Sequence, residues 1–156
     1  MTQSLENVML QLLGALLIAL VSAWLTVRLS LRRFRLERLW DRKAQSYERV
    51  LEAFHKSKKF SFEHLRAWEH GRELTDERDK ELRRLAHEAL EEILRVSDVG
   101  SFTLSSAALE LIEKYRAESD NENGINSWYE HLEHDFAVTK KYMDLVVAEA
   151  KRDLAQ

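Results

Sequence analysis

The sequence predicts an all-α protein, with one N-terminal transmembrane helix followed by a cytosolic bundle of about four helices. Two observations support this prediction. The 156 residues include no proline and only four glycines, and 33% of them are charged, which is typical of long helices with few breaks. A run of 21 residues, from Asn7 to Val27, contains no charged side chain. The chain also lacks cysteine, which excludes disulfides, thiolate metal sites and cysteine nucleophiles.

The uncharged run predicts a membrane span. A helix of this length extends about 30 Å, which matches the hydrocarbon core of a bilayer. A cleaved signal peptide would carry basic residues before its apolar run, whereas here they follow it. In a third interpretation the run is a buried core helix, but a very small domain would then have to bury a helix that is apolar on all sides. The expected parts are a short outer tail (1–6), a transmembrane helix (7–27), a basic neck (28–43) and a cytosolic helical domain (44–156).

The charges are divided unevenly between the neck and the body. Residues 1–43 carry seven basic and three acidic side chains, whereas the rest of the chain carries 17 basic and 24 acidic ones, a net charge of −7. Basic residues beside a span mark its cytoplasmic end, so we expect the N-terminus outside and the C-terminal domain in the cytoplasm. The acidic body argues against DNA as a partner. The neck residues expected to fix the span against the lipid bilayer are Arg28, Arg32, Arg33 and Arg35.

Small side chains recur at every fourth position along one face of the predicted span. They are Ala15, Ala19 and Ala23. Small residues at this spacing let membrane helices approach closely, so we expect a homo-oligomer. A single helix cannot enclose a path across a bilayer, and any membrane-disrupting activity would therefore need several chains.

In the body, apolar residues recur at three- and four-residue spacings, which predicts helices throughout. The first continues the span to about His70 and ends at Gly71. The second begins at the N-cap Thr75 and ends near Gly100. The residues expected to face the core are Tyr47, Val50, Leu51, Phe54, Phe62, Leu65 and Trp68 in the first helix and Leu82, Leu85, Ala86, Ala89, Leu90, Ile93 and Leu94 in the second.

The remaining residues predict two further helices. The segment GSFTLSS, residues 100–106, is the only strand-like stretch, and Ser105 or Ser106 is expected to cap the third helix. The polar segment SDNENG, residues 119–124, predicts a loop. The last helix is expected to carry an apolar stripe that begins at Ile125.

Residue patterns that would indicate catalysis or metal binding are weak. His131 and His134 lie three positions apart among acidic residues, which alone does not make a zinc site. Glu52 and His55 form the only Glu-x-x-His motif, whereas a di-iron bundle needs two. The sequence contains no motif that marks a Ser-His-Asp catalytic triad and no glycine-rich phosphate-binding loop. We therefore expect no metal, no cofactor and no enzymatic activity.

One segment mixes cations with aromatic side chains, FHKSKKFSFEHLRAW at residues 54–68. Phosphates and bases bind to such combinations. The segment TKKY at residues 139–142 and the turn at Gly100 would add a second wall if the last helix packs beside the first. The residues expected to bind an anionic ligand are Lys58, Lys59, Arg66, Ser101, Lys140 and Lys141. In the alternative interpretation, the aromatic rings belong to the core and the lysines are solvated.

The segments FRLERLWDRKAQSYERVLEAFHKSKKF, DVGSF and AKRDL follow one another along nearly the whole chain. This order resembles a broad group of small single-pass bacterial proteins with a Trp-x-x-Lys-Ala-x-x-Tyr signature after the span, here Trp40, Lys43, Ala44 and Tyr47. Length, topology and body are also similar to the membrane-anchored effector of some type III CRISPR systems. That resemblance implies a location in the bacterial inner membrane, a role in antiviral defence, and a tetramer that binds cyclic tetra-adenylate and perturbs the membrane.

Two classes of function remain open from the sequence. In the first, the protein is a ligand-gated membrane effector, whose cytosolic domain binds a cyclic oligoadenylate messenger and shifts the packing of the spans. In the second, it is a membrane-tethered helical adaptor that recruits a cytosolic protein partner. The first requires that the ligand bind two arrangements of the protein with different affinities.

Overall fold

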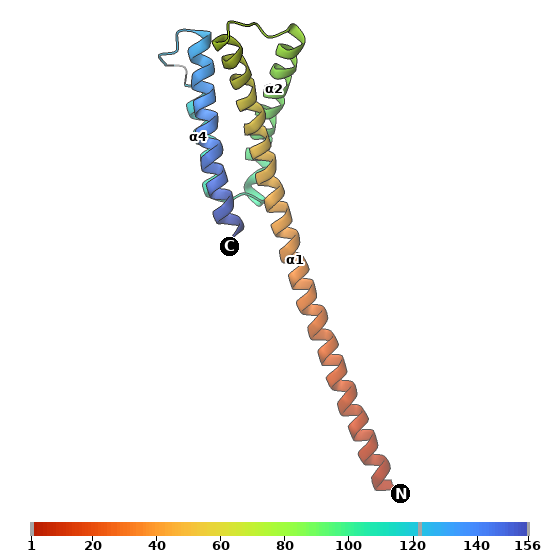
Figure 1. The fold of residues 1–156 in the computed structure, drawn as a ribbon. Helices are drawn as coiled ribbons and strands as arrows, with labels where there is room; N and C mark the ends of the chain where they lie inside the picture. The colour runs from red at the N-terminus through yellow and green to blue at the C-terminus, as the bar shows by residue number, and fades with distance from the viewer. Residues whose placement is uncertain (1, 122, 156) are drawn as a thin grey trace. The chain divides into compact units, whose positions relative to one another are not determined.

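The computed structural model describes the backbone of residues 2–121 and 123–155, and the side chains of residues 14–100, 102–121 and 123–155. Within this described backbone every regular element is helical, as the composition predicts (Figure 1). The elements are α1 (Thr2–Glu69), α2 (Asp76–Val99), the 3-10 helix η1 (Gly100–Phe102), α3 (Ser106–Ser119) and α4 (Trp128–Leu154). The chain divides into two compact units, one ending at Trp40 and the other beginning at Asp41.

The first unit is the N-terminal part of α1. From Gly14 onward this helix is long and apolar enough to cross a membrane, and no residue of its most apolar stretch is buried. Its large apolar side chains between residues 16 and 27 are 48–70% exposed, so they do not form part of a protein core in this chain. The helix is therefore a candidate membrane span. The side chains of the expected outer tail and of residues 7–13 lie outside the described residues.

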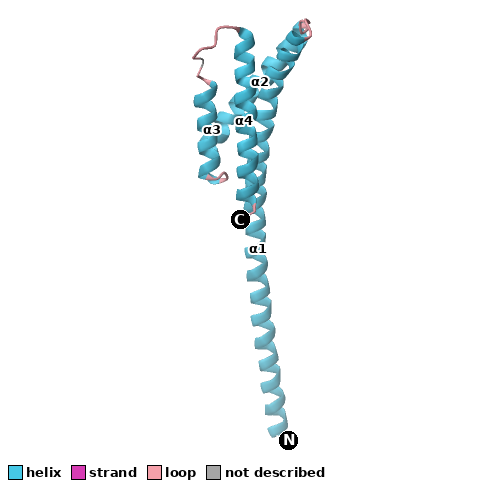
Figure 2. Ribbon diagram, turned by 60° about the vertical axis from the view of Figure 1, so that its left-hand side comes forward, coloured by secondary structure: helices cyan, strands magenta, loops and turns pink. Residues whose placement is uncertain are grey.

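The second unit has its own apolar core, to which the C-terminal part of α1 and all of the later helices contribute. Phe54 of α1 is fully buried and meets the ring of Tyr115 of α3 edge-on, with 4.8 Å between ring centroids. Helices α3 and α4 lie side by side (Figure 2), and Tyr115 also contacts Tyr142 of α4. Ile93 of α2 is fully buried in the same cluster. Burying aromatic and branched side chains from all four helices is what holds the unit together.

The helix limits follow local chemistry, as the sequence predicts for most of them. Helix α1 ends at Glu69, and Gly71 adopts a left-handed conformation with φ +60° that favours glycine. Each of the next three α-helices begins with a hydroxyl cap whose side chain accepts a backbone N–H bond, and the caps are Thr75, Ser105 and Ser127. The predicted caps Thr75 and Ser105 are thereby confirmed.

Two local predictions are wrong. The strand-like segment 100–106 forms η1, a turn and the first residue of α3, and the N–H groups of Thr103 and Leu104 both bond to the carbonyl of Gly100 within the segment and not to a partner strand. The last helix begins three residues after Ile125, because Gly124 adopts a positive φ and Ser127 supplies the cap. Ile125 therefore lies in the connection between α3 and α4.

Three residues that periodicity placed in the core are exposed. They are Phe62, Trp68 and Leu90, at 46%, 65% and 48%. Phe62 and Trp68 belong to the last turns of α1, where their rings pair with Phe136 and Tyr129 of α4 at the surface. Helical spacing identifies a face but not the point along the helix at which neighbours stop covering it.

Candidate functional site

A cleft of about 900 Å³ opens along the last turns of α1. Its walls are the C-terminal end of α1, the connection between α1 and α2, and one turn of α4. The residues that line it are His55, Lys58, Lys59, Phe62, Glu63, Arg66, Ala67 and His70 from α1 and just beyond its end, Arg72, Glu73 and Leu74 from the connection, and Phe136 and Lys140 from α4. This volume is within the range of pockets that hold small molecules.

The cleft is strongly cationic although the body as a whole is acidic. Its five cations are Lys58, Lys59, Arg66, Arg72 and Lys140, and its two carboxylates are Glu63 and Glu73. Glu63 is already engaged, because Arg78 of α2 donates two hydrogen bonds to it and holds its pKa below the usual range. Among the described residues, no carboxylate lies within 4.0 Å of four of the cations, Lys58, Arg66, Arg72 and Lys140. The positive charge of the cleft is therefore largely uncompensated.

Two phenylalanine rings lie among these cations. Phe62 of α1 and Phe136 of α4 are stacked, with 6.1 Å between centroids and 30° between ring planes. Lys58 projects from α1 toward α4, so that its Nζ lies 4.0 Å from the sulfur of Met143. An apolar ring surface beside several cations is suited to a ligand that combines a planar ring with phosphate groups.

Helical spacing explains why these side chains converge. Lys59, Phe62, Glu63 and Arg66 recur at three- and four-residue intervals and so share one face of α1. Phe136 and Lys140 are four residues apart and share one face of α4. Two different helices thus each contribute one ring and at least one cation to the same cleft.

A part-buried polar contact joins α1 to α4 next to the cleft. Ser61 is fully buried, and its hydroxyl donates a hydrogen bond to the carboxylate of Asp135. Burial raises the pKa of the Asp135 carboxyl, and the hydrogen bond from Ser61 and the nearby His131 and His134 oppose that rise. Phe136, the next residue along α4, pairs with Phe62 of α1, so the two contacts lie side by side between the same helices.

No family model, curated protein or solved structure matches this chain.

The structure brings four of the six predicted ligand residues together in the cleft. They are Lys58, Lys59, Arg66 and Lys140. Lys141 does not line it: its Nζ forms an ion pair with Glu118 of α3 at 2.7 Å and lies over the ring of Tyr142. The side chain of Ser101 lies outside the described residues.

The turn at Gly100 does not form the second wall of the cleft that the sequence suggested. A Cβ at Gly100 would meet the side chain of Leu104 at 3.1 Å, so the turn packs against its own segment. The hydroxyl of the nearby Thr103 accepts a hydrogen bond from Ser46 at 2.8 Å, nine residues before the cleft begins at His55 on α1. The second wall comes from α4 and from the connection after α1 instead.

Sequence reasoning missed Arg72 and Phe136 as members of the cleft. The signal for Phe136 was present, since it precedes Lys140 by one helical turn and matches the ring and cation spacing of Phe62 and Arg66. Arg72 carries no such signal, because it follows Gly71 in an irregular connection whose path is set by packing. In the described residues, no group of three or more histidine and acidic side chains is placed to hold a metal ion.

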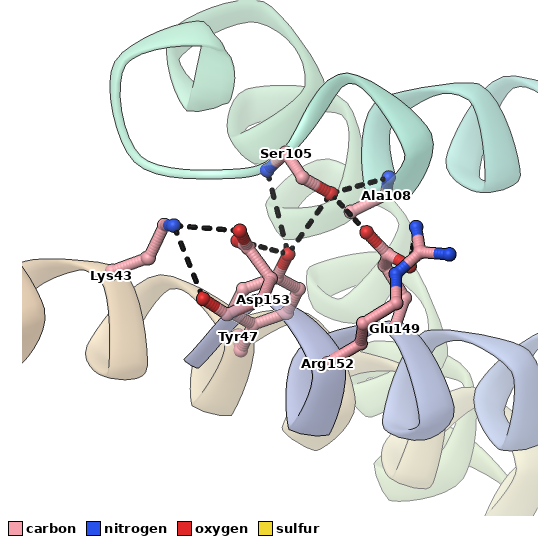
Figure 3. A network of polar contacts seen from close by, with 7 residues as sticks. All are labelled: Lys43, Tyr47, Ser105, Ala108, Glu149, Arg152 and Asp153. Atoms are coloured by element: carbon pink, nitrogen blue, oxygen red, sulfur yellow. Dashed lines mark hydrogen bonds and ion pairs between the residues drawn. The ribbon is translucent and has the colours of Figure 1, made fainter. Parts of the chain in front are cut away.

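A second polar cluster joins α1, the start of α3 and the end of α4 (Figure 3). The ammonium group of Lys43 pairs with Asp153 at 2.7 Å, and the hydroxyl of Tyr47 donates to the other carboxylate oxygen of Asp153 at 2.8 Å. Ser105 donates to the buried Glu149 at 2.6 Å, and Arg152 also pairs with Glu149 at 2.5 Å. We call these six residues the polar clamp.

The polar clamp explains why two residues of the Trp-x-x-Lys-Ala-x-x-Tyr signature are spaced as they are. Lys43 and Tyr47 are four residues apart, so both reach the single carboxylate of Asp153 from one face of α1. Burial raises the pKa of the Tyr47 hydroxyl. Burial also acts to raise the pKa of Asp153, but the hydrogen bonds from Lys43 and Tyr47 outweigh it and hold that pKa below its usual range. Lys43 and Tyr47 of the signature thus make structural contacts between α1 and α4.

Proposed function

We propose that this protein is a membrane-anchored, ligand-gated effector whose cytosolic domain binds an anionic nucleotide messenger in the cleft between α1 and α4. One observation carries the proposal: five cations line the same cleft as a stacked pair of phenylalanine rings, in a body with a net charge of −7. An acidic domain that concentrates uncompensated positive charge in one concave site is organised to bind a negative group there.

The two parts of the cleft match the two parts of a nucleotide. Hydrogen bonds between lysine or arginine and phosphate each contribute about 1.5–3 kcal/mol. A base that stacks on an aromatic side chain contributes about 1–3 kcal/mol. Inorganic phosphate would use only the cations, whereas a nucleotide would also use Phe62 and Phe136.

Gating would act through the helices that form the walls. The cleft takes side chains from both α1 and α4, so a ligand that contacts Lys59 and Lys140 together favours the arrangement that holds these two side chains at its phosphates. Helix α1 also contains the candidate span, which makes it the element through which the effect would reach the membrane. The resemblance to membrane-anchored CRISPR effectors makes cyclic tetra-adenylate the first messenger to test and antiviral defence the first role.

The test measures binding of fluorescent cyclic tetra-adenylate, ATP and inorganic phosphate to the full chain in detergent. Lys140→Gln removes a cation that lines the cleft, whereas Lys141→Gln removes the adjacent cation, which pairs with Glu118 outside it. We expect Lys140→Gln to weaken nucleotide binding about tenfold, since the loss of one charge-assisted contact is worth at least 1.4 kcal/mol. Lys141→Gln should leave the affinity within about twofold of wild type.

Two results would contradict the proposal. The first is that the wild-type chain binds none of the nucleotides saturably, in which case the adaptor function becomes the better hypothesis. The second is that the two lysine variants weaken binding equally, because that would assign the effect to net charge and not to the cleft. Near-ultraviolet circular dichroism of each variant controls for folding.

A further inference from the structure

The neck contains a second cationic surface, which the cleft does not use. Arg28, Arg32 and Arg35 follow one another at spacings of four and three residues and so lie on one face of α1. Together with the apolar side chains of Trp24 and Leu31, they line a shallow groove of about 750 Å³. We call this surface the arginine face.

The charges of the arginine face are uncompensated. Arg33, the neighbour of Arg32 in sequence, lies about 100° around the helix from it and forms an ion pair with Glu37 at 3.0 Å. Within the described part of the chain, no carboxylate lies within 4.0 Å of Arg28, Arg32 or Arg35. The guanidinium of Arg28 lies 5.0 Å from the centre of the Trp24 ring, which leaves its edge free to donate hydrogen bonds.

The arginine face begins where the uncharged run ends. Arg28 is the first charged residue after Val27, and the helix rises about 10 Å from Arg28 to Arg35. The polar layer on each side of a bilayer is about 5–8 Å thick, so the three arginines span the depth at which lipid phosphates lie if residues 7–27 cross the membrane. Trp24 then lies at the boundary with the hydrocarbon, where indole rings are enriched.

We propose that the arginine face binds an anionic phospholipid. Guanidinium groups suit a phosphodiester because their N–H donors form paired bonds to its oxygens. The apolar side chains of Trp24 and Val27 lie on the membrane side of the arginines in the same groove and provide a surface for the acyl chain. The headgroup must carry a net negative charge. A zwitterionic lipid has no net charge and would leave the positive charge of the three arginines, which have no carboxylate partner, without compensation. The proposal rests on the membrane anchor of the proposed function but not on nucleotide binding.

Two arginines provide a matched pair for the test. Arg32 and Arg33 are adjacent, so they lie at nearly the same depth, and Arg32→Gln and Arg33→Gln remove the same charge. They differ in the face of the helix from which that charge is removed. General electrostatic attraction between the neck and an anionic surface would make the two variants equivalent, whereas a lipid site on the arginine face makes them different.

The full chain is reconstituted into vesicles of phosphatidylcholine that contain either spin-labelled phosphatidylglycerol or spin-labelled phosphatidylcholine. Electron spin resonance then gives the association of each lipid with the protein relative to bulk lipid. We expect wild type to prefer phosphatidylglycerol, and Arg32→Gln to reduce that preference about fivefold, because it removes one charge-assisted contact to the lipid phosphate. Arg33→Gln should reduce it less than twofold, and excess inorganic phosphate should not displace the labelled lipid.

Flotation of the vesicles separates the two ways in which the proposal can fail. If wild type does not float with phosphatidylcholine vesicles, the membrane anchor is refuted and the lipid site with it. If wild type floats but shows no preference for phosphatidylglycerol, or if both variants lose the preference equally, the arginine face is refuted and the anchor stands. Displacement of the lipid signal by inorganic phosphate would also refute it, because it would show a site for free phosphate.

Discussion

Substitution of Lys43 by methionine tests how much the polar clamp contributes to stability. The pair between Lys43 and Asp153 has an N–O distance of 2.7 Å, and its side chains are 33% and 10% exposed. A second pair in the same unit, between Lys114 and Glu110, has the same distance but side chains that are 58% and 66% exposed. The two pairs have the same N–O distance but differ in burial, and only the pair of Lys43 joins two helices, which makes Lys114→Met the exposed, intrahelical control.

The expected loss in the free energy of unfolding follows from the contacts that Asp153 keeps in the Lys43→Met variant. Methionine retains most of the aliphatic stem but removes the ammonium donor, so Asp153 keeps only Tyr47 as a donor from α1. A hydrogen bond to a charged group contributes about 1.5–3 kcal/mol, and the partial exposure of Lys43 reduces this to about 1–2 kcal/mol. Lys114→Met should not change the stability measurably, because water replaces the lost partner of an exposed carboxylate.

The measurement is urea unfolding of the full chain in a non-ionic detergent, followed by near-ultraviolet circular dichroism. This signal comes largely from aromatic side chains held in fixed surroundings, such as the buried Tyr47, Tyr115 and Tyr142, so a span that stays helical in detergent contributes little to it. The cost should also depend on pH. Because the folded-state pKa of Asp153 is lowered, its stabilisation is complete above the ordinary value of about 3.9 and is lost as the pH falls through the folded-state value.

The difference in the free energy of unfolding between wild type and Lys43→Met should therefore decrease as the pH is lowered. The reasoning is refuted if Lys43→Met and Lys114→Met cost the same, since burial would then not matter. It is also refuted if the cost of Lys43→Met persists at a pH where Asp153 is protonated.

Two further predictions concern part-buried polar groups. Ser105→Ala removes the cap of α3 and a donor to the buried Glu149, and it should lower the free energy of unfolding by about 1–2 kcal/mol in the same urea assay. Ser106→Ala, at the exposed neighbouring position, should lower it little. Equal effects of the two substitutions would argue against the cap. Asp135→Asn should raise the thermal unfolding temperature at neutral pH, because burial raises the pKa of Asp135 and its charged form there costs stability. That gain should shrink as the pH is lowered and wild-type Asp135 becomes protonated, and a loss of stability at neutral pH would show that the carboxylate is needed in its charged form.

Much of the fold could be predicted because its boundaries are marked by local chemistry. Gly71 ends a helix through a conformation that other residues rarely adopt, and Thr75 and Ser105 begin helices through hydroxyl caps. These signals depend on a few adjacent residues and so are visible in the sequence. The segment 100–106 was misread because β-branched and aromatic residues favour strands only where a partner strand exists.

The candidate site could be predicted only in part, because it depends on how α4 is rotated about its own axis. Lys140 and Lys141 are adjacent and identical in type, yet one lines the cleft and the other pairs with Glu118. The packing of the buried face of α4 and the contact between Ser61 and Asp135 are tertiary, and contacts between residues so far apart in sequence leave no local pattern. Arg72 was missed for a similar reason, since its place depends on the path of a connection.

The hydroxyl of Ser105 performs two tasks at once, and this restricts which residues evolution can place there. It accepts the backbone N–H of Ala108 at 3.1 Å and donates to Glu149 at 2.6 Å. Aspartate, an equally good cap in other helices, would add a third carboxylate beside Glu149 and Asp153, and glycine would supply no donor. In related sequences that preserve both acidic residues, this position should therefore vary between serine and threonine, while the exposed Ser106 next to it should vary freely.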